Sequence, residues 1–170
     1  EIFHYEAEAQ IRLQLCAAFY YLGAYDKALD QALKANEIAR EHDYVRLLIK
    51  SFYQTSAIYR ALAHLSQSDD KKEENFKRAN FNNNEAKSLY RSIHIKDPYL
   101  KAKVYYNIAA LEADFPQWGD KSLAERYYKK AIKIFDALGV ADEQHRSKIR
   151  LARLRFEGGQ QKEAQQILDS

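Results

Sequence analysis

Residues 20–39 read YYLGAYDKALDQALKANEIA and place a tight turn between two helical segments. Gly23 suits the turn, because glycine adopts the left-handed backbone that commonly ends a helix. Ala28, Ala32 and Ala35 then recur at the spacing of one helix face, where small residues let a second helix cross closely. The stretch therefore predicts two antiparallel helices joined at Gly23.

The segment before this turn has its own apolar pattern. Leu15, Phe19 and Leu22 follow the i, i+4, i+7 spacing, with Ile11 one turn earlier. This spacing predicts an amphipathic helix.

The same periodicity continues to the end of the chain, with short polar breaks. Short breaks make neighbouring helices antiparallel, so the chain is expected to form four hairpins. The polar run at residues 82–84 is interpreted as a solvated helix face. The predicted helices span residues 3–22, 25–41, 44–66, 71–95, 98–114, 119–138, 142–157 and 160–169.

Three aspartates mark expected helix starts. Asp43, Asp97 and Asp142 each precede an apolar-periodic segment, and Pro98 follows Asp97. An aspartate side chain can accept from the unpaired amides of a first turn, and proline at the first position lacks such an amide.

Composition agrees with an all-α protein. The 170 residues contain 5 glycines and 2 prolines, which are too few turn-forming residues for a β-sheet architecture of this length. Charged residues make up 30% of the chain and the formal net charge is +3, which is too small to indicate nucleic acid binding by itself.

Nothing in the sequence indicates an export signal or a membrane span. No apolar run approaches the ~20 residues of a transmembrane helix, and the first residues are acidic and polar. The single cysteine excludes a disulfide within the chain and fits a reducing, cytoplasmic compartment, and an extracytoplasmic sensor domain without disulfides is the alternative. The absence of methionine suggests a piece of a longer or processed protein.

Comparison of the segments with one another reveals a repeat. The third hairpin has Ala109, Ala124, Tyr128 and Ala131 in register with the first, and the most divergent, second hairpin offers Ser56 as its small residue. The remaining markers are Ala79, Ala86, Ala152, Gly159 and Ala164.

This pattern of glycine, tyrosine and alanine resembles the tetratricopeptide repeat along nearly the whole chain. The resemblance implies an all-α, right-handed solenoid forming one domain over residues 1–170, with units near 3–41, 44–95, 98–138 and 142–169. The small residues of the second helices fall at positions 28, 79, 124 and 164, so the units exceed the usual length of about 34 residues. In this they are similar to Rap-type regulators, kinesin light chains and MalT-like activators. An ordinary helical bundle with accidental alanines is the alternative.

In that family the first helix of each pair lines a concave surface, and the resemblance implies that Asn107 matches a peptide-binding position. Aligned on Cys16, Ser56, Ala109 and Ala152, the four first helices carry rows of amides and cations without a carboxylate. Amides can pair with a peptide backbone and cations with carboxylates. The predicted groove residues are Gln14, Lys50, Gln54, Arg60, Lys103, Tyr106, Asn107, Arg146, Arg150 and Arg153. The alternative is that these side chains only solvate an exposed face.

Aromatic residues flank the rows and suit either binding or packing between repeats. They are Tyr20, Tyr21, Tyr53, Tyr106 and Phe156. Trp118 lies in a loop, and we expect it to anchor that loop on its own hairpin.

No catalytic constellation is apparent. The five histidines are scattered without metal-ligand spacing. Cys16 stands where the repeat needs a small residue, so we expect it in the core. We therefore expect neither enzyme activity nor a metal or cofactor.

The sequence favours a scaffold or sensor module that binds a protein or peptide with acidic groups. A nucleic-acid-binding repeat is a second hypothesis, because Arg146, Arg150, Arg153 and Arg155 lie in one helix. An accessory domain of an enzyme or signalling protein is the third.

Overall fold

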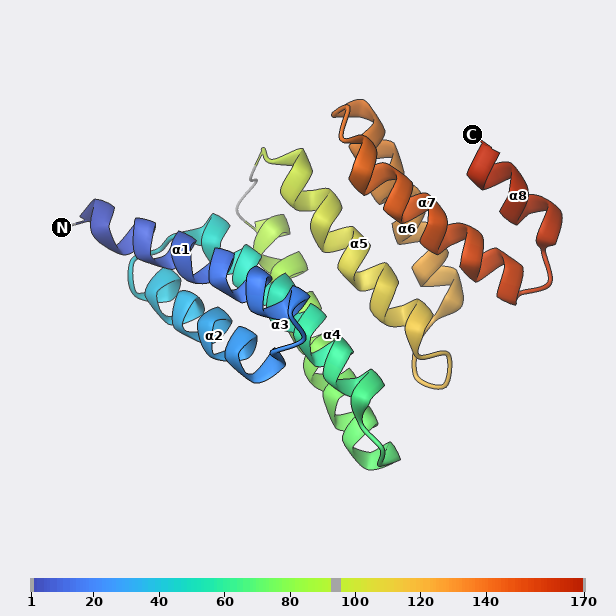
Figure 1. Ribbon diagram of the computed structural model, residues 1–170. Coiled ribbons are helices and arrows are strands. Elements are labelled where there is room, and N and C mark those ends of the chain that lie inside the picture. The colour runs from blue at the N-terminus through green and yellow to red at the C-terminus, as the bar shows by residue number, and fades with distance from the viewer. Residues whose placement is uncertain (1, 93–95, 170) are drawn as a thin grey trace. The chain divides into compact units, whose positions relative to one another are not determined.

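The computed structural model of the protein describes residues 2–92 and 96–169, and it is all-α over that part of the chain (Figure 1). The predicted helices agree with the observed ones within about two residues; the predicted end at 95 lies outside the described residues. The helices are α1 (Ile2–Tyr21), α2 (Tyr25–Glu41), α3 (Val45–Leu65), α4 (Asp69–Ser92), α5 (Pro98–Asp114), α6 (Lys121–Ala137), α7 (Ala141–Glu157) and α8 (Gln161–Asp169).

The helices pack as consecutive pairs within two compact units, residues 1–95 and 96–170. In the first unit α1 packs on α2, α2 on α3, and α3 on α4, while α1 also contacts α3. The second unit repeats this plan with α5 to α8, and α5 also contacts α7. The predicted arrangement of helical hairpins is confirmed inside each unit.

One turn geometry joins four of the helix pairs. After α1 the Ala24 amide donates to the Phe19 carbonyl over 2.9 Å, and Gly23 between them has φ +72°. This six-to-one hydrogen bond satisfies a carbonyl that the helix end leaves open. Gly139 and Gly159 have the same backbone, and Asp43 adopts it at φ 55°. The prediction for Gly23 is confirmed.

The helix starts agree only in part with the predicted aspartate caps. Asp97 accepts from the Leu100 amide over 2.9 Å, as predicted. Asp43 is no cap, because it occupies the left-handed turn before Tyr44. Asp142 is no cap either, because it already lies in the first turn of α7. The cap that sequence reasoning missed is Asp120, which accepts from the first amides of α6.

The small residues that mark the repeat are buried where helices cross. In the first unit Cys16 from α1, Ala28 and Ala32 from α2, and Ile58 from α3 form one core cluster. Burial raises the pKa of the Cys16 thiol to about 12, because the thiolate would lose its hydration. Cys16 is therefore a core residue, as predicted. The other markers Ser56, Ala79, Ala86, Ala109, Ala124, Ala131, Ala152 and Ala164 are buried too.

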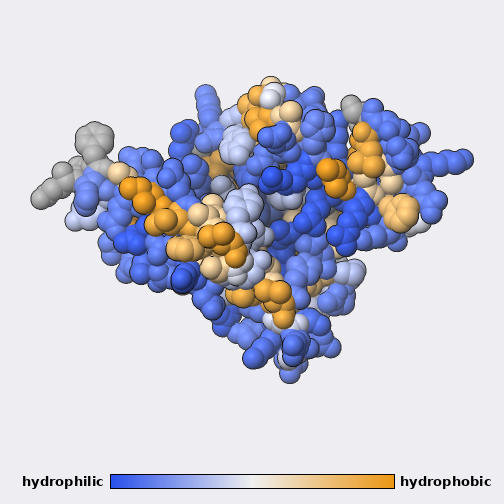
Figure 2. All heavy atoms as spheres, viewed as in Figure 1, coloured by the Kyte–Doolittle hydropathy of each residue, from blue (hydrophilic) through white to orange (hydrophobic). Residues whose placement is uncertain are grey.

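The apolar stripe of α1 is not the buried face of that helix. Ile11, Leu15 and Leu22 are 55%, 43% and 79% exposed, whereas Leu13 and Cys16 point into the core. An amphipathic helix normally turns its apolar side inward. Here the core takes a second apolar face with Ala9, Leu13 and Cys16, and of the predicted stripe only Phe19 packs against the core cluster. Figure 2 shows hydrophobic side chains gathered in a band over this helix.

Two further predictions concern single residues. Asn83 lies inside α4 and is buried, so the interpretation of residues 82–84 as a solvated face is wrong for that residue. Trp118 stacks on Phe115 of the same loop with ring centroids 6.2 Å apart, so it anchors its own hairpin as predicted.

Candidate binding surface

In the first unit the predicted groove residues lie on α1 and α3, which contact each other. Gln14 is exposed on α1, and Lys50 and Gln54 are half-buried on α3, one helical turn apart. Arg60, two turns further along α3, is buried. Gln14 and Gln54 occupy matching positions of α1 and α3, and Lys50 lies one turn before Gln54. Arg60 is a largely enclosed guanidinium.

Gln54 carries a polar atom that the fold leaves without a hydrogen bond. Its Oε1 is buried and accepts no hydrogen bond from any described residue. The Lys50 ammonium likewise makes no ion pair within the part of the chain that the structure describes. A buried acceptor without a donor costs free energy, so the present position of the Gln54 amide is unfavourable.

In the second unit the cations of the rows are matched by carboxylates. Lys103 on α5 donates to Glu143 on α7 over 2.8 Å, and both side chains are more than four-fifths buried. Arg146 lies 3.9 Å from the other oxygen of Glu143. The sequence rows contain no carboxylate, but Glu143 reaches this surface from outside the rows. Lys103 and Arg146 therefore form a mixed-charge cluster rather than a purely basic one.

The remaining arginines of α7 are paired in the same way. Arg150 donates to Asp114, at the end of α5, over 3.2 Å. Arg153 bonds Glu157 over 2.6 Å on an exposed part of the helix, and Arg155 pairs with Glu125 of α6. The pKa of Glu125 is lowered, first by Lys129 and then by Arg155. The four arginines thus do not present an uncompensated basic face.

The two uncharged residues of α5 in the predicted groove, Tyr106 and Asn107, make contacts within the protein. Asn107 is buried, and its Nδ2 donates to the Lys103 carbonyl of its own helix over 2.9 Å. Tyr106 is buried and meets the Tyr128 ring edge-to-face at 5.9 Å. Lys103 also lies over the Tyr106 ring, 6.0 Å from its centroid. Both side chains are therefore buried under the predicted groove and are not exposed on it.

The flanking aromatics divide between surface and packing. Tyr21 and Phe156 are exposed, and Tyr53 is half-buried. Tyr20 packs edge-to-face on Tyr25, with ring centroids 5.6 Å apart. Tyr20 therefore serves the first hairpin, while Tyr21 and Phe156 remain accessible.

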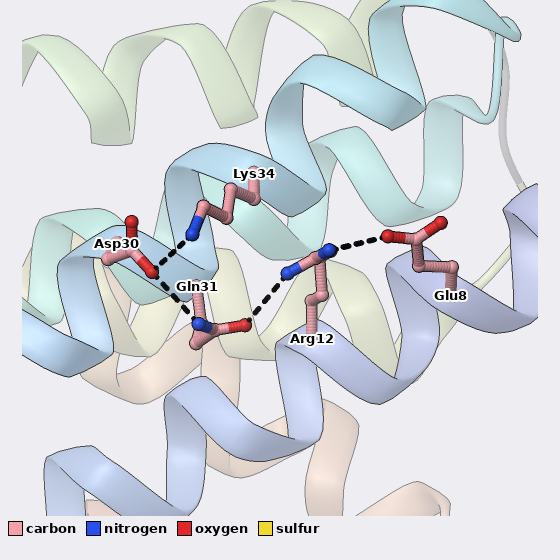
Figure 3. A network of polar contacts seen from close by, with 5 residues as sticks. All are labelled: Glu8, Arg12, Asp30, Gln31 and Lys34. Carbon is pink, nitrogen blue, oxygen red and sulfur yellow. Dashed lines mark hydrogen bonds and ion pairs between the residues drawn. The ribbon is translucent and has the colours of Figure 1, made fainter.

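A polar network that the repeat pattern does not indicate joins the first two helices (Figure 3). Arg12 on α1 donates to Glu8 of its own helix and, over 3.2 Å, to Gln31 on α2. Gln31 in turn donates to Asp30, which also pairs with Lys34 over 2.9 Å. Its two carboxylates balance its two cations, so the network is electrically neutral.

Within residues 2–92 and 96–169 no group of three or more metal-ligating side chains comes together. In the same residues no helix has the length and apolar character needed to cross a bilayer.

Comparison with known proteins gives a likeness in fold. No protein-family model matches the chain, and no curated protein matches it. Among solved structures, BtubC (BKLC) from P. vanneervenii is similar, with a TM-score of 0.68 and 18% identical residues over 95% of this chain. The chain spans 60% of the length of that structure. The likeness, together with the packed hairpins, shows an all-α helical repeat fold.

Proposed function

We propose that this chain is a tetratricopeptide-type scaffold that holds a protein or peptide segment against the polar rows of its first helices, and that it acts by binding rather than as an enzyme. The observation that carries the proposal is the buried Gln54 Oε1, which has no donor within the described residues. A peptide backbone supplies N–H donors at regular intervals, and an amide side chain can accept from one of them.

The charge of Lys50 is our reason to propose that the bound segment carries acidic side chains. It lies one turn from Gln54 on the same face of α3 and has no carboxylate partner among the described residues. An ammonium beside an amide acceptor suits a segment with an acidic side chain next to an exposed backbone N–H.

The second unit offers a different kind of contact. Lys103, Arg146 and Arg150 already have Glu143 and Asp114 as partners. A ligand carboxylate there would compete with an internal one, so we assign the primary contact to Gln54 and Lys50. The same pairing gives a nucleic-acid role no support from the arginines of α7.

A selection experiment tests the proposal. Peptides selected from a random phage-displayed library on the 170-residue chain are measured by fluorescence anisotropy against the double variant Gln54→Leu/Lys50→Met. We expect affinity to fall at least tenfold, which corresponds to the loss of one charged and one neutral hydrogen bond. The matched control, Gln161→Leu/Lys162→Met, changes the same residue types at exposed positions of α8 and should alter affinity less than twofold.

Stability separates binding from folding in this experiment. Gln54→Leu removes a buried acceptor that has no donor, so the variant should unfold at the same or a slightly higher temperature. Lost binding together with retained helicity supports the proposal. Unchanged affinity in the Gln54→Leu/Lys50→Met variant, or failure to select any peptide, would overturn it.

A further inference from the structure

Three cations surround a pair of tyrosines on the hairpin of α5 and α6. The rings of Tyr105 on α5 and Tyr127 on α6 lie with their centroids 5.0 Å apart. Lys101 lies over the Tyr105 ring, 5.8 Å from its centroid, and Lys130 lies over both rings, at 5.7 and 5.5 Å. Arg126 lies over the Tyr127 ring at 5.7 Å. We call these five residues the tyrosine–cation cluster.

The cluster occupies the positions that hold the neutral network in the first hairpin (Figure 3). The two hairpins are aligned on the small residues of their first and second helices. The network residues Glu8, Arg12, Asp30, Gln31 and Lys34 then correspond in order to Lys101, Tyr105, Arg126, Tyr127 and Lys130. The geometry agrees with this alignment, because one contact between the two helices joins the same two positions in each hairpin. It is the hydrogen bond from Arg12 to Gln31 in the first and the ring contact in the second.

The two sets of residues differ in charge. The network balances two cations with two carboxylates, whereas the cluster has three cations and no carboxylate. None of the three cations forms an ion pair with a carboxylate of residues 2–92 or 96–169. The pKa of Asp120 is lowered first by the amide of Leu123 and least by the charge of Arg126. Asp120 is therefore engaged as the cap of α6 and does not neutralise the cluster.

The charges of the cluster are accessible and are not needed to close the hairpin. Arg126 and Lys130 are exposed, and Lys101 is half-buried. A ring face attracts a cation but does not neutralise its charge. The first hairpin packs with balanced charges at the same positions, so the fold itself does not require an excess of cations there. An anion that binds to the cluster would reduce the repulsion among the three.

We propose that the tyrosine–cation cluster binds an acidic segment of a partner protein, whose carboxylates pair with Lys101, Arg126 and Lys130. Lys101 and Lys130 both lie within 6 Å of the Tyr105 centroid. In an extended segment, side chains two residues apart point to the same side and lie about 7 Å apart. Two acidic side chains with that spacing can therefore reach two cations that share one ring, and each ion pair adds charge-assisted hydrogen bonds.

The burial of the rings favours an acidic segment over nucleic acid. Proteins hold single-stranded nucleic acid by stacking bases on exposed aromatic rings along a positively charged groove. Tyr127 is only 6% exposed, and Tyr105 is half-buried with two lysines over its ring. The cluster therefore presents charges to a partner rather than stacking surfaces.

An acidic peptide provides the probe. A fluorescein-labelled peptide of alternating glutamate and serine is titrated with the 170-residue chain at low salt and followed by fluorescence anisotropy. The triple variant Lys101→Gln/Arg126→Gln/Lys130→Gln should bind it at least tenfold more weakly, because three charge-assisted hydrogen bonds are lost. The same peptide with glutamine in place of glutamate should bind the native chain at least tenfold more weakly than the acidic one. Equal affinity of the two peptides would contradict the proposal.

The matched control removes the same charges elsewhere. Arg46→Gln/Lys71→Gln/Lys162→Gln takes one arginine and two lysines from exposed positions, so the net charge falls equally. Affinity for the acidic peptide should stay within threefold of the native value. Equal weakening by both triple variants would show that net charge alone attracts the peptide, and the cluster would have no specific role.

Two further measurements keep the test decisive. Lys130→Gln changes a single exposed side chain and should weaken binding about threefold, even if the triple variant loses helicity. An unchanged affinity of that variant would count against the cluster. Oligothymidylate or inorganic phosphate is then added as a competitor. Displacement of the acidic peptide by either one at an equal concentration would mean that the cluster selects phosphate groups, and the assignment to an acidic segment would fall.

This inference does not rest on the function proposed for the polar rows. The cluster belongs to α5 and α6, whereas Gln54 and Lys50 belong to α3. The Gln54→Leu/Lys50→Met variant should bind the acidic peptide within threefold of the native affinity. If that variant loses the peptide and the triple variant keeps it, the peptide binds the polar rows and the cluster proposal is wrong. Failures of the two proposals are therefore distinguishable.

Discussion

Asp43 holds a left-handed backbone conformation that three similar turns of this chain give to glycine. Glycine adopts that conformation without the steric cost that a Cβ atom brings. We expect Asp43→Gly to raise the free energy of unfolding by about 0.5–1 kcal/mol, as measured by urea denaturation. Gly139→Ala is the converse control and should lower it by about 1 kcal/mol through backbone strain alone, because a Cβ there meets no atom within 4 Å. A destabilised Asp43→Gly variant would contradict this account.

Glu112 is the residue whose burial couples stability to pH. Burial raises the pKa of its carboxyl group, and this effect outweighs the hydrogen bond that its Oε2 accepts from the Asp120 amide over 2.7 Å. The folded protein therefore binds more protons than the unfolded chain between the ordinary and the raised pKa. The stability that Glu112 contributes is complete below the ordinary carboxyl pKa and is lost as pH rises through the raised one.

Glu112→Gln should remove this dependence while keeping an oxygen acceptor for Asp120. In urea titrations from pH 4 to pH 7 the advantage of the variant over the native chain should grow with pH and vanish near pH 4. Asp120→Asn should show a dependence of opposite sign at lower pH, because the amide of Leu123 holds the pKa of Asp120 below its ordinary value of 3.8 and the stability that this carboxylate contributes is lost only as pH falls below that value. A stability difference for Glu112→Gln that does not change with pH would refute the assignment.

At the scale of helices, periodicity predicts each element well because every helix repeats its small and apolar residues over several turns. Periodicity fails to predict burial at positions where a neighbouring helix decides which side chain is covered. Asn83 breaks the polar appearance of residues 82–84 because α4 turns that position toward the core. The face of α1 that enters the core carries Leu13 and Cys16, and the equally apolar Ile11 and Leu15 stay outside. One sequence cannot rank two apolar faces, because the choice depends on which helices lie alongside.

Ion pairs between α5 and α7 give the prediction that belongs to this scale. Lys103→Met leaves Glu143 largely buried, with a long hydrogen bond of 3.5 Å from the Tyr99 hydroxyl and the 3.9 Å contact to Arg146. We expect the free energy of unfolding to fall by about 1–3 kcal/mol, because a buried carboxylate loses its closest hydrogen-bond donor and its ion-pair partner. The double variant Lys103→Met/Glu143→Leu should recover most of this loss in a double-mutant cycle. Arg153→Met removes a largely exposed pair and should cost less than about 1 kcal/mol.

At the scale of the whole molecule, the sequence predicts which residues of the first helices share a helix position, but it does not predict their burial or their ion-pair partners. Alignment of the first helices places Gln14, Lys50 and Gln54 on matching faces, because equal positions in a repeat lie at equal places on a helix. It does not reveal that Glu143 and Asp114 reach the cations of the second unit. Glu143 and Asp114 stand at other positions of the aligned helices. Comparing one repeat position at a time therefore does not identify them.

The packing of each unit among its own four helices leads to a prediction about cooperativity. Stability in helical repeats is a sum of local terms, so a defect acts most strongly on its neighbours. Ala32→Gly, at the buried crossing of α1 and α2, should cost about 1–2 kcal/mol through helix propensity and lost packing. Native-state hydrogen exchange should then show faster exchange in α1 to α3 than in α6 to α8. Equal acceleration in both regions would mean that the four hairpins unfold together, as the predicted single domain over residues 1–170 requires; a local effect would show that they open separately.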